Sequence, residues 1–224
     1  MRVVAFDMGK KNFAWAVVDI STNVVECFDL VDLDQTANVY RNLHAYLLRT
    51  EPVFRDCGVV LVEQQMKSNY QALKLSQHVM AFFYLRFPEK TILEWSASYK
   101  TSVYGLEKTT KSCRKRFAVE KVRETLRDDP VVADLFEMLG KKDDVADCIL
   151  MCFSFGIKNK KKAVDKKKNE IVIREGGNLA VAEGVAAIKT QLQPRESATD
   201  REGTLPGQEK RESSVPADFV SRHG

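Results

Sequence analysis

Two acidic side chains end apolar segments of this sequence, and a carboxylate in that position can bind a cation or transfer a proton. Asp7 follows the apolar residues 3–6, and Glu63 follows residues 59–62. Because consecutive residues of each run are apolar, both faces of each strand should be buried, as in the centre of an α/β sheet. If the strands run parallel, the two acids lie side by side at the carboxyl edge, where such sheets place functional sites. A turn or cap acid is the ordinary alternative for either residue alone.

Three further acids lie in a late segment with the sequence KKDDVADCILMCF. Asp143 and Asp144 alone can be explained by the favourable interaction of acids with a helix N-terminus. Asp147 is different, because apolar residues surround it and a buried carboxylate needs a cation or several hydrogen-bond donors. Asp144 at i−3 and Asp143 at i−4 share its helix face. The helix is therefore predicted to present a pair of acids to a positive group.

The negative charges of carboxylates that lie close together must be balanced, because like charges repel. At about 4 Å, two of them repel by about 1 kcal/mol in water and by about 4 kcal/mol at an effective dielectric of about 20. Four would oppose folding unless protons, Lys or Arg side chains, or metal ions balance them. All-oxygen ligands favour Mg²⁺ or Mn²⁺ over Zn²⁺. Two such ions about 3.5–4 Å apart suit phosphodiester hydrolysis, because one activates water and the other stabilises the leaving oxygen.

Basic side chains gather in the segment 100–127, although the net charge of the chain is only +4. Residues 1–156 carry equal numbers of basic and acidic side chains, so the excess falls in 157–224. The basic residues of the segment far outnumber its acids, and they are Lys100, Lys108, Lys111, Arg114, Lys115, Arg116, Lys121, Arg123 and Arg127. This local patch predicts a polyanionic partner. A solvated helix face is the other interpretation.

The elements that must position these side chains follow from the apolar pattern. Strands are expected at 1–7, 13–19, 24–30, 59–63 and 91–95, and the first three should form an antiparallel meander, with hairpin residues at 21–23. Helices are expected at 36–49, 69–87, 111–127, 130–139 and 142–155, with a loop between Pro52 and Gly58. The fold class is therefore α/β. We expect one domain at 1–156 and a Lys-rich, largely disordered tail at 157–224.

Composition narrows the class of protein further. The chain has 224 residues, 44% of them hydrophobic and 29% charged, as in a soluble globular protein. No apolar run approaches the roughly 18 residues of a membrane span, and no secretory leader is evident. The five cysteines form no C-x-x-C pair, so we expect reduced thiols in an intracellular, reducing compartment.

Three motifs, in this order, resemble those of RNase H-like nucleases. They are A-F-D-M-G-K-K-N at 5–12, V-L-V-E-Q-Q at 60–65 and K-K-D-D-V-A-D at 141–147. The pattern is similar to that of the RuvC-like Holliday junction resolvases, and most similar to those of poxviruses and other large DNA viruses. Lys100 follows the fifth strand, where these enzymes keep a lysine near the site. The resemblance covers about residues 1–156.

The resemblance implies an RNase H-like fold with a five-stranded mixed sheet in the order 3-2-1-4-5, flanked by helices. It implies a homodimeric endonuclease that resolves four-way DNA junctions in recombination, repair or the resolution of replication concatemers, in a viral case at the site of viral DNA replication. The implied metal ligands are Asp7, Glu63, Asp144 and Asp147, with Asp143 as an alternative to Asp144. They would hold two Mg²⁺ ions, for which Mn²⁺ can substitute, and Lys100 would contact the scissile phosphate.

The resemblance also gives the basic segment a partner. Lys108, Lys111, Arg114, Lys115 and Arg116 would bind the arms of branched DNA through phosphates, without reading sequence. No membrane and no small-molecule cofactor are expected.

Three other functions stay open. An RNase H-type enzyme would cut RNA in a hybrid, but such enzymes carry the second acid on a helix rather than at the end of a strand. A non-catalytic nucleic-acid-binding protein could use the same fold. The turn D-M-G-K-K-N also resembles the first phosphate loop of actin-like ATPases, which need a second such loop and a Gly pair; the pair here, Gly176 and Gly177, falls in the tail.

Overall fold

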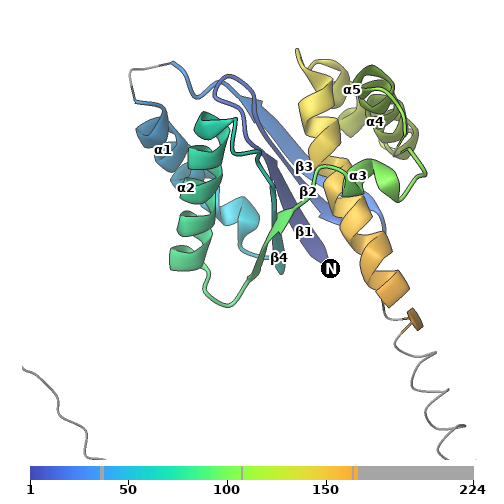
Figure 1. Cartoon of the computed structure of the whole chain (residues 1–224), viewed down its shortest axis with the longest axis horizontal. Coiled ribbons are helices and arrows are strands. Elements are labelled where there is room, and N and C mark those ends of the chain that lie inside the picture. The colour runs from blue at the N-terminus through green and yellow to red at the C-terminus, as the bar shows by residue number, and fades with distance from the viewer. Residues whose placement is uncertain (36–37, 107, 163, 166–224) are drawn as a thin grey trace, which may run out of the picture. The chain divides into compact units, whose positions relative to one another are not determined.

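A five-stranded mixed sheet forms the centre of the fold, in the order β3-β2-β1-β4-β5 (Figure 1). The computed structural model describes residues 1–35, 38–106, 108–162 and 164–165. The strands are β1 (Arg2–Asp7), β2 (Phe13–Asp19), β3 (Val24–Val31), β4 (Val59–Glu63) and β5 (Thr91–Trp95). β1 is antiparallel to β2 and parallel to β4, and β5 is parallel to β4. The predicted strand order is confirmed.

Helices cover both faces of this sheet, and this explains why the residues of β1 are apolar on both sides. Val4 and Phe6 point toward α1 (Val39–Phe54) and α2 (Tyr70–Arg86), while Val3 and Ala5 pack against the opposite layer. That layer contains α3 (Tyr99–Ser102), α4 (Lys111–Thr125), α5 (Pro130–Glu137) and a last helix at residues 142–162, drawn yellow to orange in Figure 1. β1 is thus the central, fully covered strand that its sequence predicts.

The helix α1 differs from its predicted span. It runs through Pro52 to Phe54, so the loop expected between Pro52 and Gly58 is shorter than predicted. A proline removes one amide donor, and here the carbonyl that loses its partner belongs to the exposed Leu48. The gain is the burial of Phe54, whose ring lies 5.5 Å from Phe6 and 5.1 Å from Trp15 between centroids. Aromatic packing on the sheet therefore outweighs the helix-breaking tendency of Pro52.

The last helix also extends beyond its predicted end. The expected end before Gly156 is wrong, because the helix continues to residue 162. Gly156 is buried, and a Cβ atom there would lie 3.3 Å from Cβ of Ile20. This glycine therefore allows close packing against the end of β2. The rest of the predicted tail, residues 166–224, lies outside the described residues, and the domain boundary stays a prediction.

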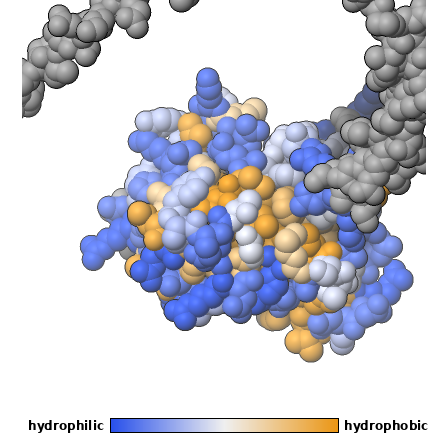
Figure 2. Space-filling view, turned by 90° about the horizontal axis from the view of Figure 1, so that it is seen from below, coloured by the Kyte–Doolittle hydropathy of each residue, from blue (hydrophilic) through white to orange (hydrophobic). Residues whose placement is uncertain are grey.

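On the face shown in Figure 2, hydrophobic residues gather near the centre and hydrophilic residues surround them. Among the described residues, no helix is long and apolar enough to cross a bilayer. All five cysteines, Cys27, Cys57, Cys113, Cys148 and Cys152, have free thiols.

Candidate active site

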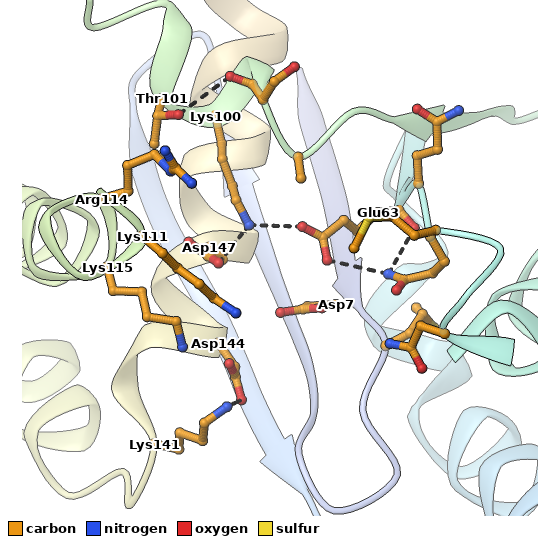
Figure 3. A pocket seen from close by; sticks show the side chains of 17 residues that line it. Asp7, Glu63, Lys100, Thr101, Lys111, Arg114, Lys115, Lys141, Asp144 and Asp147 are labelled. Carbon is orange, nitrogen blue, oxygen red and sulfur yellow. Dashed lines mark hydrogen bonds and ion pairs between the residues drawn. The ribbon is translucent and has the colours of Figure 1, made fainter. Parts of the chain in front are cut away.

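The four predicted acids and Lys100 line one pocket of about 690 Å³ at the carboxyl edge of the parallel strands (Figure 3). They come from β1, β4, α3 and the last helix. The remaining lining residues are Met8, Gln64, Gln65, Met66, Asn69, Ala97, Ser98, Thr101, Lys111, Arg114, Lys115 and Lys141. Segments separated by as many as 140 residues therefore meet at this edge.

Strand register places Asp7 beside Glu63. Phe6 pairs with Val62 across the parallel β1–β4 ladder, so the acid that follows each of them reaches the same edge. Burial, followed by the charge of Glu63 and a hydrogen bond between the two carboxyl groups, raises the pKa of Asp7 well above its usual value. Burial also opposes the charge of Glu63, yet Lys100 and hydrogen bonds from Asp7 and Gln65 hold its pKa below the usual value. Of the two carboxyl groups, Asp7 is therefore the harder one to ionise.

Lys100 links the sheet to the last helix. Its Nζ donates to Oε1 of Glu63 at 2.8 Å and to Oδ2 of Asp147 at 2.6 Å, as Figure 3 shows. Burial lowers the pKa of Lys100, but the charges of Asp147, Glu63 and Asp7 outweigh it and raise the pKa overall. Burial raises the pKa of Asp147 despite this contact. Lys100 is thus a buried ammonium group that balances two of the four acids.

The side chains of Asp144 and Asp143 lie in different surroundings. Asp144 lines the pocket and accepts a hydrogen bond from Nζ of Lys141, and burial raises its pKa. Asp143 accepts from Nζ of Lys115 and is absent from the pocket lining. Burial raises the pKa of Asp143, but Lys115 and Lys141 outweigh burial and lower it. Of the two alternatives, Asp144 is the one placed in the pocket with Asp147.

The donor chemistry of this pocket fits divalent cations, although the side chains are not arranged around one. In the part of the chain that the structure describes, no three His, Cys, Asp or Glu side chains form a group that could hold a metal ion. The ammonium groups of Lys100 and Lys141 instead contact the carboxylates. Burial and the charge of Glu63 still raise the pKa of Asp7 well above its usual value. The carboxylate oxygens are ligands of the kind that suits Mg²⁺ or Mn²⁺.

The predicted DNA-binding residues divide into two groups. Lys111, Arg114 and Lys115 line the pocket on the α4 side. Lys108 and Arg116 do not line it, and the guanidinium of Arg116 lies 3.9 Å from the carboxylate of Glu120 on the exposed face of α4.

Sequence reasoning missed several lining residues. Lys141 is part of the motif 141–147 and precedes Asp144 by three residues, so helical spacing could have indicated it. Gln65 donates from Nε2 to Oε2 of Glu63 at 3.3 Å, and only the folded loop after β4 brings it back to that carboxylate.

Comparison with solved structures assigns the fold. The chain resembles the Holliday junction resolvase of fowlpox virus, with a TM-score of 0.53 and 18% identity over 70% of this chain and 99% of that one. The same resolvase in complex with its substrate junction DNA gives a TM-score of 0.54. RuvC of Thermus thermophilus gives 0.51 at 14% identity, over 71% and 97% of the two chains. The fold is therefore that of the RuvC-like, RNase H-like class.

Sequence comparison identifies the family. Residues 1–159 match the family described as Poxvirus A22 protein, and the chain belongs to that family. A relative, uncharacterized protein 97L of Invertebrate iridescent virus 3, is 29% identical over 66% of this chain and 96% of its own length. The predicted resemblance to viral RuvC-like resolvases is confirmed.

Proposed function

We propose that this chain is a structure-selective endonuclease that resolves four-way DNA junctions by metal-dependent phosphodiester hydrolysis. One observation carries the proposal: acids from β1, β4 and the last helix meet Lys100 in a pocket that is lined on one side by the basic helix α4. Membership of the Poxvirus A22 protein family and the fold shared with the fowlpox resolvase support it.

In this proposal Asp7, Glu63, Asp144 and Asp147 hold two Mg²⁺ ions. When bound, the ions supply Lewis acidity and a metal-activated water for attack on the phosphodiester. The acids first have to release their lysine partners, since Lys100 and Lys141 now neutralise them. Asp7 must also be ionised to act as a ligand, which burial and the charge of Glu63 oppose.

Released from the acids, the ammonium group of Lys100 is free to contact the scissile phosphate. It is already charged, and it reaches the pocket from a segment separate from the acids. A fixed positive charge at this position stabilises the negative charge that develops on the phosphate oxygens in the transition state. Lys100 therefore acts on the rate more than on the affinity for DNA.

The basic side chains of helix α4 indicate that the partner carries phosphate groups. Lys111, Arg114 and Lys115 line the pocket beside the acids, so a DNA strand in the pocket would meet phosphate-neutralising groups next to the hydrolytic centre. Lys108 and Arg116 extend this basic surface beyond the pocket. A homodimer with two such pockets would cut the two strands of a junction symmetrically.

An RNase H-type activity on RNA–DNA hybrids is less well supported. Glu63 is the last residue of β4, whereas RNase H enzymes carry this acid on a helix. The position of Glu63 therefore favours the resolvase assignment.

The first test is cleavage of synthetic substrates. The full chain is incubated with a four-way junction, a flap, a plain duplex and an RNA–DNA hybrid, with Mg²⁺, with Mn²⁺ and with EDTA. We expect nicks at paired positions in opposite strands of the junction, dependent on either metal. Cleavage that persists undiminished in EDTA would disprove the metal mechanism, and preferential cutting of the hybrid would reassign the enzyme to the RNase H type.

A further inference from the structure

Lys158, in the last helix, contacts two aromatic rings next to the segment that carries Lys100. Its Nζ lies 2.9 Å from the ring centroid of Tyr99 and 5.4 Å from that of Trp95. Both distances are within the roughly 6 Å range of a cation–π interaction. Lys158 is half-buried, whereas Lys160 and Lys161 on the same helix are exposed. Lys158 therefore has a contact that its neighbouring lysines do not show.

The same helix holds the partner rings at two further points. The indole Nε1 of Trp95 donates to Oγ of Ser154 at 2.9 Å, and its ring packs edge-on against Phe155 at 5.4 Å. Trp95 in turn packs against Tyr99 at 5.2 Å. Ser154, Phe155 and Lys158 thus fix the end of β5 and the start of α3 to the last helix, which lies beside α3 in Figure 1.

The helix α3 depends on outside contacts for its position. It spans only Tyr99–Ser102, and its N-cap residue Ser98 makes no side-chain capping hydrogen bond. A single turn has too few internal hydrogen bonds to be stable alone. Lys100 is the residue after Tyr99, so a shift of the α3 backbone on release of the Tyr99 ring would carry the ammonium group away from Glu63 and Asp147.

We infer that Lys158 is a positioning residue, which holds α3 so that Lys100 reaches into the active-site pocket. The effect on the rate rests on the proposed function, but the effect on α3 does not. Lys158 itself is not among the residues that line the pocket. It acts through Tyr99.

The structural part is tested by amide hydrogen exchange of the full chain without metal or DNA. In Lys158→Ala, amides of residues 99–104 should exchange about threefold to thirtyfold faster, while those of β1 stay unchanged. Lys158→Arg keeps the cation and should restore protection. Lys161→Ala, which removes a charge from the same helix, should leave α3 as it is. Unchanged exchange of α3 in Lys158→Ala overturns the inference.

The functional part is tested by single-turnover cleavage of a four-way junction. Lys158→Ala should lower the cleavage rate constant about threefold to tenfold with little change in Kd, and Lys158→Arg should recover it. In a Lys100→Ala background the same change should cost no further rate, because the two residues act as one unit. A loss confined to Kd, or fully additive losses, would make Lys158 a phosphate contact instead.

The two parts fail separately. If the unmodified chain and its variants all fail to cut a junction, the proposed function is wrong. The exchange rates of α3 still decide whether Lys158 holds this helix. If the unmodified chain cuts but Lys158→Ala changes neither exchange nor rate, only the positioning role is lost.

Discussion

Two neighbouring acids, Asp143 and Asp144, differ in what they face, and this difference defines the site at the scale of single residues. Asp144 shares the pocket with Asp147, whereas Asp143 pairs with Lys115 and does not itself line the pocket. Burial raises the pKa of Asp144, while Lys115 and Lys141 outweigh burial and lower that of Asp143. Both acids have a lysine partner, so it is the place of Asp144 in the pocket that assigns it, rather than Asp143, to act with Asp147.

Asn substitutions test this assignment. Asp144→Asn or Asp147→Asn should lower the cleavage rate more than about 100-fold while junction binding survives. The reason is that losing a metal ligand weakens a metal site more than losing a residue that only surrounds the ligands. Asp143→Asn is the matched control and should cut within about threefold of the unmodified rate. Rate constants and gel-shift affinities are measured side by side. If Asp144→Asn cuts normally and Asp143→Asn does not cut, Asp143 is the metal ligand and Asp144 is not.

Lys100 is the second residue whose role can be separated by measurement. Lys100→Ala should lower the cleavage rate about 100-fold, since one charged donor to the transition state is lost, and change Kd little. The control is Lys111→Ala, an exposed lysine at the same pocket, which should weaken binding more than it slows cutting. Equal losses in rate and affinity for Lys100→Ala would reassign it to plain phosphate contact.

At the scale of elements, the turn between β1 and β2 holds Asp7 in place. Gly9 approaches the backbone so closely that a Cβ atom there would lie 2.3 Å from the carbonyl oxygen of Asn12. Real Cβ atoms do not come this near, so a side chain at this position must move the turn. The turn follows Asp7 by one residue, and its displacement would be passed to that carboxyl group.

Gly9→Ala should therefore lower the free energy of unfolding by about 1–3 kcal/mol and reduce cleavage. Gly58→Ala is the control, because a Cβ at Gly58 meets nothing within 4 Å and its backbone is not in the left-handed region. That variant should be as stable as the unmodified chain or slightly more so. Urea denaturation compares the three proteins, and equal stability of both variants would show that the turn adapts to Gly9→Ala at no cost.

At the scale of the whole molecule, charge is distributed unevenly. The net charge of +4 comes from the region after residue 156, while residues 1–156 are balanced. Lys166, Lys167 and Lys168 belong to this region and lie outside the described residues. They are expected to add non-specific attraction to DNA rather than chemistry.

A truncation after residue 165 should cut junctions at an unchanged single-turnover rate but bind more weakly. The slope of log K against log salt concentration should fall in magnitude by up to about 3, since each lysine that contacts a phosphate releases about one counterion. The control is the full chain with Lys166, Lys167 and Lys168 replaced by Gln, which should reproduce the change in slope. A truncated chain that fails to fold would show that the domain extends past residue 165.

Much of this architecture was predictable because it depends on local pattern. Runs that are apolar at every residue predicted the central strands β1 and β4, and their terminal acids predicted Asp7 and Glu63 at one edge. The i,i+3 spacing of Asp144 and Asp147 placed both on one helix face. The ends of helices were less predictable, since Pro52 and Gly156 usually end a helix and here do not.

Tertiary structure alone decided how Glu63, Asp147 and Asp143 are compensated, whereas Lys141 and Asp144 are close in sequence. The amino-acid sequence determined the strands, the helices and which carboxyl groups share an edge, because apolar periodicity and strand alternation are properties of neighbouring residues. That the ammonium group of Lys100 lies between Glu63 and Asp147, and that Lys115 pairs with Asp143, depends on segments far apart in the chain meeting at one place. The distances between charges in such distant segments follow from packing, and no local pattern encodes them.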